Sequence, residues 1–427
     1  MTEQHLRVIE ICAGAGGQSL GLEKAGFEHE LAIELDENAV NTLRHNRPHW
    51  KVRQGDVADL TVWNPADYAP EKLDGQPIEL FAGGVPCPPF SIAGKQLGAS
   101  DERDLFAWAI EQVNILKPRA VLLENVRGLS MPRFAGYRQH VLDRLAEFGY
   151  AAEWSLLEAS DYGVPQLRPR FVLIAMSPAD FDYFHWPKRI GDPPTVGETL
   201  LDLMKANGWD GAEEWAAKAN DIAPTIVGGS KKHGGADLGP SRAKRAWAAL
   251  GVDALGVHDQ APPYTEKRPM TELGPKLTCE MVARIQGWDN DEFKWEFTGK
   301  KTSNYRQIGN AFPPPVAKAL GMAIAAALNR TVERRKGGID IHHDPIYRAL
   351  RDNGDFMTAV QIAEATELAL SPEELERRIS LLAHDFSIEV NSDDALVSYK
   401  LGEFKAFLGQ DNHARHDQFE RYRTKIS

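Results

Sequence analysis

The sequence predicts an α/β fold built on a doubly wound, largely parallel sheet. Up to about residue 185, short apolar segments typical of buried strands alternate with segments of helical periodicity. Several of these strands end in glycines or in a carboxylate, and open α/β sheets bind their ligands at that edge. The alternation stops near residue 186. We therefore expect a first domain at 1–185 that 300–330 completes, a second domain at 186–299, and a small α+β appendage at 331–427.

The composition is that of a globular protein with two or three domains, since 43% of the 427 residues are hydrophobic and 26% are charged. The formal net charge of −12 argues only mildly against a nucleic-acid partner, because binding depends on a local basic face. The 3 cysteines show no disulfide or metal-ligand spacing, which predicts a reducing compartment and no metal site. No apolar run approaches about eighteen residues, so we expect a cytoplasmic protein without a membrane segment.

The first three strands predict a nucleotide-like ligand. A strand at 6–11 runs into the glycine turn Gly14-Ala15-Gly16-Gly17, where the backbone can approach a ligand and a helix can aim its amides at it. The second strand ends at Glu34, about twenty residues past the glycines, where an acid can grip a ribose diol. The third ends at Asp56. Either acid could equally be a helix N-cap or lie in a solvated turn.

The next strand leads into a rigid turn that carries a thiol. After the apolar segment 78–82, the run Gly83-Gly84-Val85-Pro86-Cys87-Pro88-Pro89 must leave the ladder, because prolines lack the N–H donor. Cys87 thus stands at the carboxyl end of a strand, and a thiol is the most nucleophilic ordinary side chain. A lone cysteine is more often structural. The polar, glycine-punctuated stretch 92–103 that follows has the character of a lid.

Two later segments add charged groups to the same edge. Glu124 interrupts the apolar strand 120–126 and is either a paired structural acid or a working one. Arg168 and Arg170 stand just before the strand 171–176 and supply always-charged donors.

The second domain and the appendage have weaker patterns. The glycine-rich segment 226–235, with its Lys and His side chains, suits contacts to phosphates and base edges, although a solvated surface loop explains it as well. Three prolines precede an apolar helix at 316–328. A capping box at Ser371 and a hairpin around 391–394 suggest a winged-helix appendage, although its acidic residues weaken a DNA-gripping role.

Taken together, these motifs occur in an order that resembles the DNA (cytosine-5)-methyltransferase family of the bacterial restriction–modification type, over residues 6 to 326. The resemblance implies a Rossmann-like methyltransferase domain, a target-recognition domain and S-adenosylmethionine as methyl donor. It also implies a set of cofactor contacts: Ile11, Gly14, Ala15, Gly16, Gly17, Glu34 on the ribose, Leu35, Asp56 on the adenine amine, Val57, Pro86, Leu105 and Asn310.

The resemblance also implies the chemistry. Cys87 would attack carbon 6 of a flipped-out cytosine, which turns carbon 5 into a nucleophile that takes the methyl group. Glu124 would hold a proton against N3, Arg168 would reach the base's carbonyl oxygen, and Arg170 would steady the site. The predicted DNA contacts are Gln96, Thr225, Gly229, Ser230, Lys231, Lys232, His233 and Arg242.

Partners and alternatives follow from the same resemblance. The expected partner is double-stranded DNA bound by a monomer, with a cognate restriction endonuclease acting on the same sequence. A tRNA methyltransferase shares the catalytic motifs but usually carries a Cys-Phe-Thr signature, which this chain lacks. An idle DNA-binding regulator would not need the full catalytic set, and a nicotinamide-dependent dehydrogenase would share the glycine turn alone. Ala93 stands where some relatives have a hydroxyl residue, and the resemblance does not cover the tail from Thr331 on.

Overall fold

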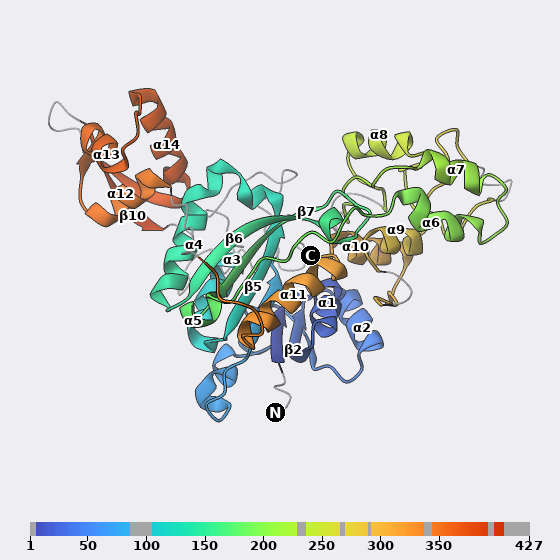
Figure 1. Ribbon diagram of the computed structural model, residues 1–427, viewed down its shortest axis with the longest axis horizontal. Coiled ribbons are helices and arrows are strands. Elements are labelled where there is room, and N and C mark those ends of the chain that lie inside the picture. The colour runs from blue at the N-terminus through green and yellow to red at the C-terminus, as the bar shows by residue number, and fades with distance from the viewer. Residues whose placement is uncertain are drawn as a thin grey trace.

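The computed structural model describes residues 6–85, 105–228, 236–264, 270–288, 292–336, 344–391 and 397–404. Its centre is a seven-stranded sheet of order β3-β2-β1-β4-β5-β7-β6 (Figure 1). The strands are β1 Leu6–Ile11, β2 Phe27–Glu34, β3 Val52–Gln54, β4 Leu80–Gly84, β5 Ala120–Val126, β6 Ala151–Glu158 and β7 Pro169–Met176. β7 runs antiparallel to both of its neighbours, and the pairs from β3 to β5 are parallel. The predicted, largely parallel sheet is therefore confirmed.

Helices cover both faces of the sheet, as the apolar strand sequences require. On one face, Phe81 and Leu123 pack with α3 and α4; on the other, Leu80 and Leu122 pack with α1 and α11. These helices and their neighbours are α1 Gly17–Lys24, α2 Glu37–Asn46, α3 Leu105–Leu116, α4 Ala135–Glu147, α5 Pro178–Phe181, α10 Lys301–Asn310 and α11 Pro314–Leu328. The doubly wound arrangement puts the carboxyl ends of β1, β2, β4 and β5 on one edge.

The run from α10 into α11, Lys301–Leu328, is long and apolar enough by composition to cross a membrane. However, 61% of its most apolar window is buried inside the protein. Val316, Leu320 and Ile324 of α11 are fully buried in the layer that also holds Leu22 of α1. The run is therefore accounted for as a core element of the α/β domain.

Four helices with long connections form the second domain, which lies beyond β7 at one end of the molecule (Figure 1). They are α6 Val196–Lys205, α7 Ala212–Lys218, α8 Ser241–Ala249 and α9 Cys279–Ile285. Capping boxes at Thr195 and Thr278 start α6 and α9. Its core is built around the buried indoles of Trp215, Trp247 and Trp288, which explains why no sequence period is visible there.

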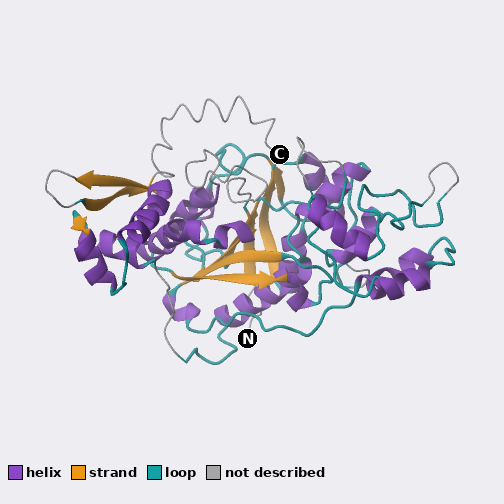
Figure 2. Cartoon of the chain, turned by 90° about the horizontal axis from the view of Figure 1, so that it is seen from above, coloured by secondary structure: helices purple, strands orange, loops and turns teal. Residues whose placement is uncertain are grey.

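The appendage lies at the opposite end of the molecule from the second domain (Figures 1 and 2). It comprises α12 Pro345–Asn353, β8 Met357–Thr358, α13 Ala359–Thr366, α14 Pro372–Asp385, β9 Phe386–Asn391 and β10 Ser398–Phe404. The predicted hairpin is present, because β9 and β10 pair antiparallel within a sheet of order β8-β10-β9. Helices followed by this hairpin are the order expected of a winged helix, and that interpretation stays a prediction.

The appendage shares a continuous core with the α/β domain through α4. The Tyr347 hydroxyl donates to Asp143 Oδ2 at 2.7 Å, and Arg351 pairs with the same carboxylate. The His140 ring stacks on Phe404 with 3.9 Å between centroids, and burial lowers the pKa of His140 to about 3, so this ring is neutral. The appendage is thus fixed on α4 by both apolar and charged contacts.

We expect Asp143→Ala to loosen the appendage more than Tyr347→Phe. The second change removes one hydrogen bond, worth about 1 kcal/mol, whereas the first leaves the Tyr347 phenol without its carboxylate acceptor and removes one of the two carboxylates that pair with Arg351, at about 1–3 kcal/mol. Amide hydrogen exchange over 344–404 measures the difference. Tyr399→Phe is the control, because the Tyr399 hydroxyl has no hydrogen bond to another described residue. Equal exchange in all three variants would contradict the assignment.

Candidate active site

The turn between β1 and α1 forms an open cradle. Gly14 and Gly16 have φ of +56° and +97°, in the left-handed region that favours glycine. A Cβ on Gly16 would stand 2.6 Å from the Trp295 ring, and a Cβ on Gly17 would stand 2.2 Å from the Phe312 carbonyl oxygen. Trp295 Nε1 also donates to the Ala15 carbonyl at 2.8 Å. The indole therefore supports the turn from behind and fixes its shape.

Glu34 is bound to this turn. Its Oε2 accepts the Gly14 N–H at 2.7 Å and its Oε1 accepts the Asp36 N–H at 2.8 Å. Burial raises the pKa of Glu34, and the same two N–H groups counter part of that rise. The N-cap of α2 is Asp36, whose side chain accepts the N–H groups of Asn38 and Ala39. The alternative that Glu34 is a helix N-cap is thus excluded, and its remaining lone pairs stay available to a diol.

Other predicted cofactor contacts gather at the neighbouring strand ends. Asp56 is 6% exposed and its Oδ1 accepts the Ala58 N–H at 2.9 Å, so it does not lie in a solvated turn. Ile11 and Val57 are buried, Leu105 is half-buried, and Leu35 is 42% exposed. Asn310 ends α10, and its Oδ1 stands 2.4 Å from the point that a Cβ on Gly228 would occupy.

Glu124 and Arg170 form a nearly buried pair at the ends of β5 and β7. Arg170 Nε lies 2.6 Å from Glu124 Oε1, and their side chains are 10% and 12% exposed. The sheet register brings them together, because Val126 pairs with Arg170 two residues beyond Glu124. Burial raises the pKa of Glu124 although Arg170, and secondarily Arg168, lower it. A carboxyl with a raised pKa keeps its proton to a higher pH than a free carboxyl does, which suits an acid catalyst.

The hydrogen bonds of Arg168 differ from the contact that we predicted for it. Its guanidinium donates to the Ile226 carbonyl at 2.7 Å and to the Gly309 and Ala311 carbonyls at 2.8 and 2.9 Å. The residue is 1% exposed. The prediction that Arg168 reaches a base is therefore wrong, since both terminal nitrogens are bound to backbone carbonyls, and the arginine beside Glu124 is Arg170.

Two glutamines that the sequence did not single out complete this contact. Gln166 Oε1 accepts the Ile226 N–H at 2.8 Å, and Gln166 Nε2 donates to Gln286 Oε1 at 2.5 Å. Gln286 Nε2 in turn donates to the Ala311 carbonyl at 2.8 Å. We call Gln166, Arg168 and Gln286 the interdomain clamp, because they join β7, the second domain and the segment between α10 and α11. The sequence signal was only that Gln166 and Arg168 are polar residues beside a buried strand.

The predicted DNA contacts are only partly covered. Arg242 is exposed on α8, and none of the ion pairs among the described residues involves it. The Thr225 hydroxyl donates to the Leu167 carbonyl and thus connects the second domain to the segment that precedes β7. The predictions that lie outside the described residues are Pro86, Cys87, Gln96, the stretch 92–103, Gly229, Ser230, Lys231, Lys232 and His233.

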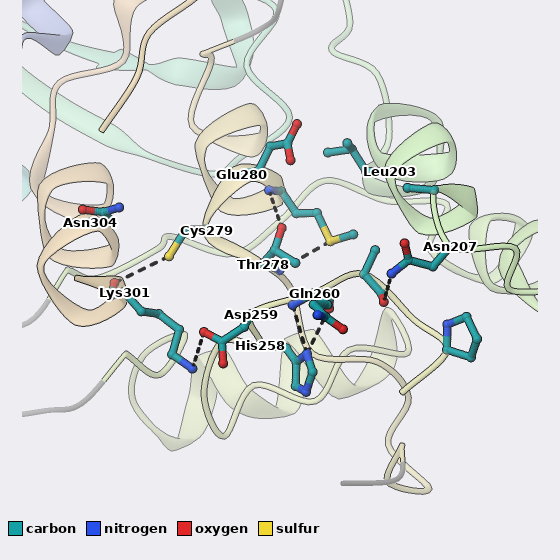
Figure 3. A pocket seen from close by; sticks show the side chains of 14 residues that line it. Leu203, Asn207, His258, Asp259, Gln260, Thr278, Cys279, Glu280, Lys301 and Asn304 are labelled. Atoms are coloured by element: carbon teal, nitrogen blue, oxygen red, sulfur yellow. Dashed lines mark hydrogen bonds and ion pairs between the residues drawn. The ribbon is translucent and has the colours of Figure 1, made fainter. Parts of the chain in front are cut away.

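A cavity of about 770 Å³ lies apart from these groups, between α6, α9 and α10 (Figure 3). None of the predicted catalytic or cofactor residues lines it. Its Cys279 thiol donates to the Lys301 carbonyl at 3.5 Å, and burial raises the pKa of Cys279 to about 11. Lys301 pairs with Asp259 at 3.0 Å. The thiol is therefore protonated at neutral pH. Across the described ranges no group of His, Cys, Asp and Glu could hold a metal ion.

Comparisons with known proteins identify the family of this chain. The family profile described as C-5 cytosine-specific DNA methylase matches residues 6–326. The chain belongs to that family. It is 64% identical over 424 residues to the type II methyltransferase M.NaeI of Lentzea aerocolonigenes, covering 99% of this chain and 100% of that protein. It is 48% identical to M.NgoMIV of Neisseria gonorrhoeae, covering 75% of this chain and 98% of that protein.

A solved structure supports the same membership. The chain is similar to a DNA modification methyltransferase encoded within an Escherichia coli prophage, with a TM-score of 0.51 and 25% identity over 76% of this chain and 99% of the other. A C-5 cytosine methylase is a DNA (cytosine-5)-methyltransferase, and a nicotinamide-dependent dehydrogenase is excluded. The full-length match to M.NaeI includes the appendage. The match to M.NgoMIV covers nearly all of that protein and only three quarters of this chain.

We expect Arg168→Met to destabilise the enzyme by about 3–5 kcal/mol, because it removes the guanidinium donor from the buried Ile226 and Gly309 carbonyls and one of the two side-chain donors from Ala311. Arg170→Met should cost about 1 kcal/mol, because Glu124 can then stay protonated in its buried site. Urea unfolding followed by tryptophan fluorescence measures both. A larger loss in Arg170→Met than in Arg168→Met would contradict the clamp.

Proposed function

We propose that this enzyme transfers a methyl group from S-adenosylmethionine to carbon 5 of a cytosine in a short double-stranded DNA sequence. The observation that carries the proposal is the Glu124–Arg170 pair, which lies at the same sheet edge as the cradle closed by Glu34. The 64% identity to a type II methyltransferase over 99% of the chain supports a modification enzyme of a restriction–modification system. A cognate endonuclease for the same sequence and a monomer working on DNA in the bacterial cytoplasm belong to this proposal.

The residues of the cradle fit S-adenosylmethionine. Glu34 offers a fixed carboxylate to the ribose hydroxyls, and the turn of Gly14 and Gly16 leaves room for a ligand at the start of α1. Asp56 would accept from the adenine amine, and Asn310 and Leu105 would complete the contacts. When bound there, the cofactor supplies an electrophilic methyl carbon on a sulfonium centre.

The chemistry of the protein side is proton control around the base. Cys87 would form a bond to carbon 6 as thiolate, and the electron pair released from the ring would make carbon 5 nucleophilic. Glu124 would protonate N3 so that this charge never accumulates on the ring, and Arg170 would hold Glu124 and donate to the base's carbonyl oxygen. After methylation the carbon 5 proton would pass to a base, the Cys87–carbon 6 bond would break and N3 would return its proton to Glu124, which restores the thiolate, the protonated carboxyl and the neutral aromatic ring. The target base must leave the duplex for these contacts.

Methyl transfer to DNA tests the proposal directly. We expect labelled S-adenosylmethionine to modify unmethylated genomic DNA at cytosine carbon 5 within one short sequence, as mapped by sequencing. Cys87→Ala should show no transfer because no covalent adduct can form. Label in tRNA but not in DNA would overturn the substrate, and equal transfer by Cys87→Ala would overturn the nucleophile.

The pH dependence tests Glu124. Since the protonated carboxyl is the working form, the single-turnover rate should fall as the pH rises through its raised pKa. Arg170 lowers that pKa, so Arg170→Met should move this alkaline limb to higher pH even if it slows the reaction. Arg348→Met, at an exposed position of α12, is the control and should leave the limb in place. An unmoved limb in Arg170→Met would assign it to another group.

A further inference from the structure

Gln18 is a buried amide without a hydrogen-bond partner among the described residues. It is the second residue of α1 and is 3% exposed. Within the described ranges neither its Oε1 nor its Nε2 has a hydrogen bond, and the Oγ of its fully buried neighbour Ser19 also has none. Buried polar groups are nearly always hydrogen-bonded, because an unpaired one is destabilising. An apolar side chain of the same size would fill this space without leaving a polar group unpaired. The amide at this position therefore indicates that a ligand binds there.

The Gln18 amide lies between the glycine turn and the Glu124–Arg170 pair. The point where a Cβ on Gly84 would stand is 3.4 Å from Glu124 Oε2, and 3.9 Å from both Gln18 Oε1 and the Cys12 carbonyl oxygen. Gly84 ends β4, and Cys12 begins the glycine turn. The side chain of Gln18 therefore crosses from α1 toward the strand end where the methyl donor and the base must meet.

The helix that carries Gln18 has an open N-terminus. Its N-cap is Gly16, which gives no side-chain hydrogen bond, and its first turn holds no acidic residue. The N–H groups and the dipole at such an end favour an anion. Because Glu34 is fixed at the opposite side of the turn by the Gly14 N–H, a ligand held there by its diol would extend its other end toward α1.

We propose that the Gln18 side chain binds the amino-acid end of S-adenosylmethionine and so positions the methyl donor; this inference rests on the proposed function. Nε2 donates to the α-carboxylate and Oε1 accepts from the α-ammonium group. A carboxamide presents one donor group and one acceptor side by side, and an amino-acid zwitterion presents the complement. The N-terminus of α1 shares the carboxylate, which explains why this turn carries no acidic side chain.

Calorimetric binding of two ligands tests the assignment without catalysis. S-adenosylhomocysteine carries the amino-acid end, and 5′-methylthioadenosine keeps the nucleoside and the thioether without it. In Gln18→Met we expect the affinity for S-adenosylhomocysteine to fall about ten- to a hundredfold, as for a lost hydrogen bond to a charged group, with 5′-methylthioadenosine unchanged. Gln18→Glu should weaken S-adenosylhomocysteine further, because its carboxylate repels the ligand's carboxylate, and should again spare 5′-methylthioadenosine.

The controls separate this inference from its alternatives. Gln112→Met changes another buried glutamine, whose Nε2 donates to the Trp108 carbonyl on α3, and should leave both affinities unchanged. Equal losses for both ligands in Gln18→Met, or no loss for either, would overturn the contact with the amino-acid end. A fall in kcat/KM for DNA with unchanged S-adenosylhomocysteine binding would assign Gln18 to the base. If the wild-type enzyme bound neither ligand, the proposed function itself would fail.

Discussion

The arrangement of the molecule depends on one buried positive charge, the Arg168 guanidinium. It is 1% exposed and both of its terminal nitrogens donate to carbonyls of two separate segments, Ile226 of the second domain and Gly309 and Ala311 at the C-terminal end of α10. Burial lowers the pKa of Arg168, because the charged form loses its solvation by water there. A buried charge of this kind is retained only where hydrogen bonds replace that solvation. The relative position of the two domains is thus fixed by a group that cannot tolerate their separation.

The start of β7 links the Arg168 contacts to the buried Glu124–Arg170 pair. Arg168 turns to the second domain and Arg170, two residues on, turns to Glu124. Pro169 between them pairs with Glu158 at the start of the β6–β7 ladder, so the two arginines have little freedom to exchange roles. A shift of the second domain that pulled on Ile226 would act on Arg168 and, through two residues of backbone, on the Glu124–Arg170 pair. The contact to the second domain and the buried pair therefore share one short segment of chain.

The sequence was sufficient to predict the sheet, the glycine turn and the positions of Glu34 and Glu124 near strand ends, because each rests on local periodicity or on a strand end. It was not sufficient to assign the two arginines. Side chains two residues apart leave a strand on the same face, and only the packed neighbours decide which one meets Glu124. The helices within the second domain could not be predicted from periodicity for a related reason, since indoles such as Trp247 build its core at no fixed spacing. Trp295, which supports the glycine turn across 280 positions of sequence, has no local signal at all.

The negative charge of the chain is distributed unevenly over the fold. The appendage from Asp344 to Phe404 holds 13 acidic residues against 5 Lys and Arg, so it accounts for eight of the twelve excess negative charges of the chain. It lies at the far end of the molecule from the second domain, where Arg242 and Arg245 are exposed on α8 (Figure 1). At physiological salt, charges separated by more than about 8 Å of solvent are largely screened from each other. Most of the acidity that argued mildly against a nucleic-acid partner thus lies in the appendage, whereas the predicted target-recognition domain at 186–299 has 17 acidic residues against 14 Lys and Arg. The net charge of the chain therefore says little about the local charge at the exposed arginines of α8.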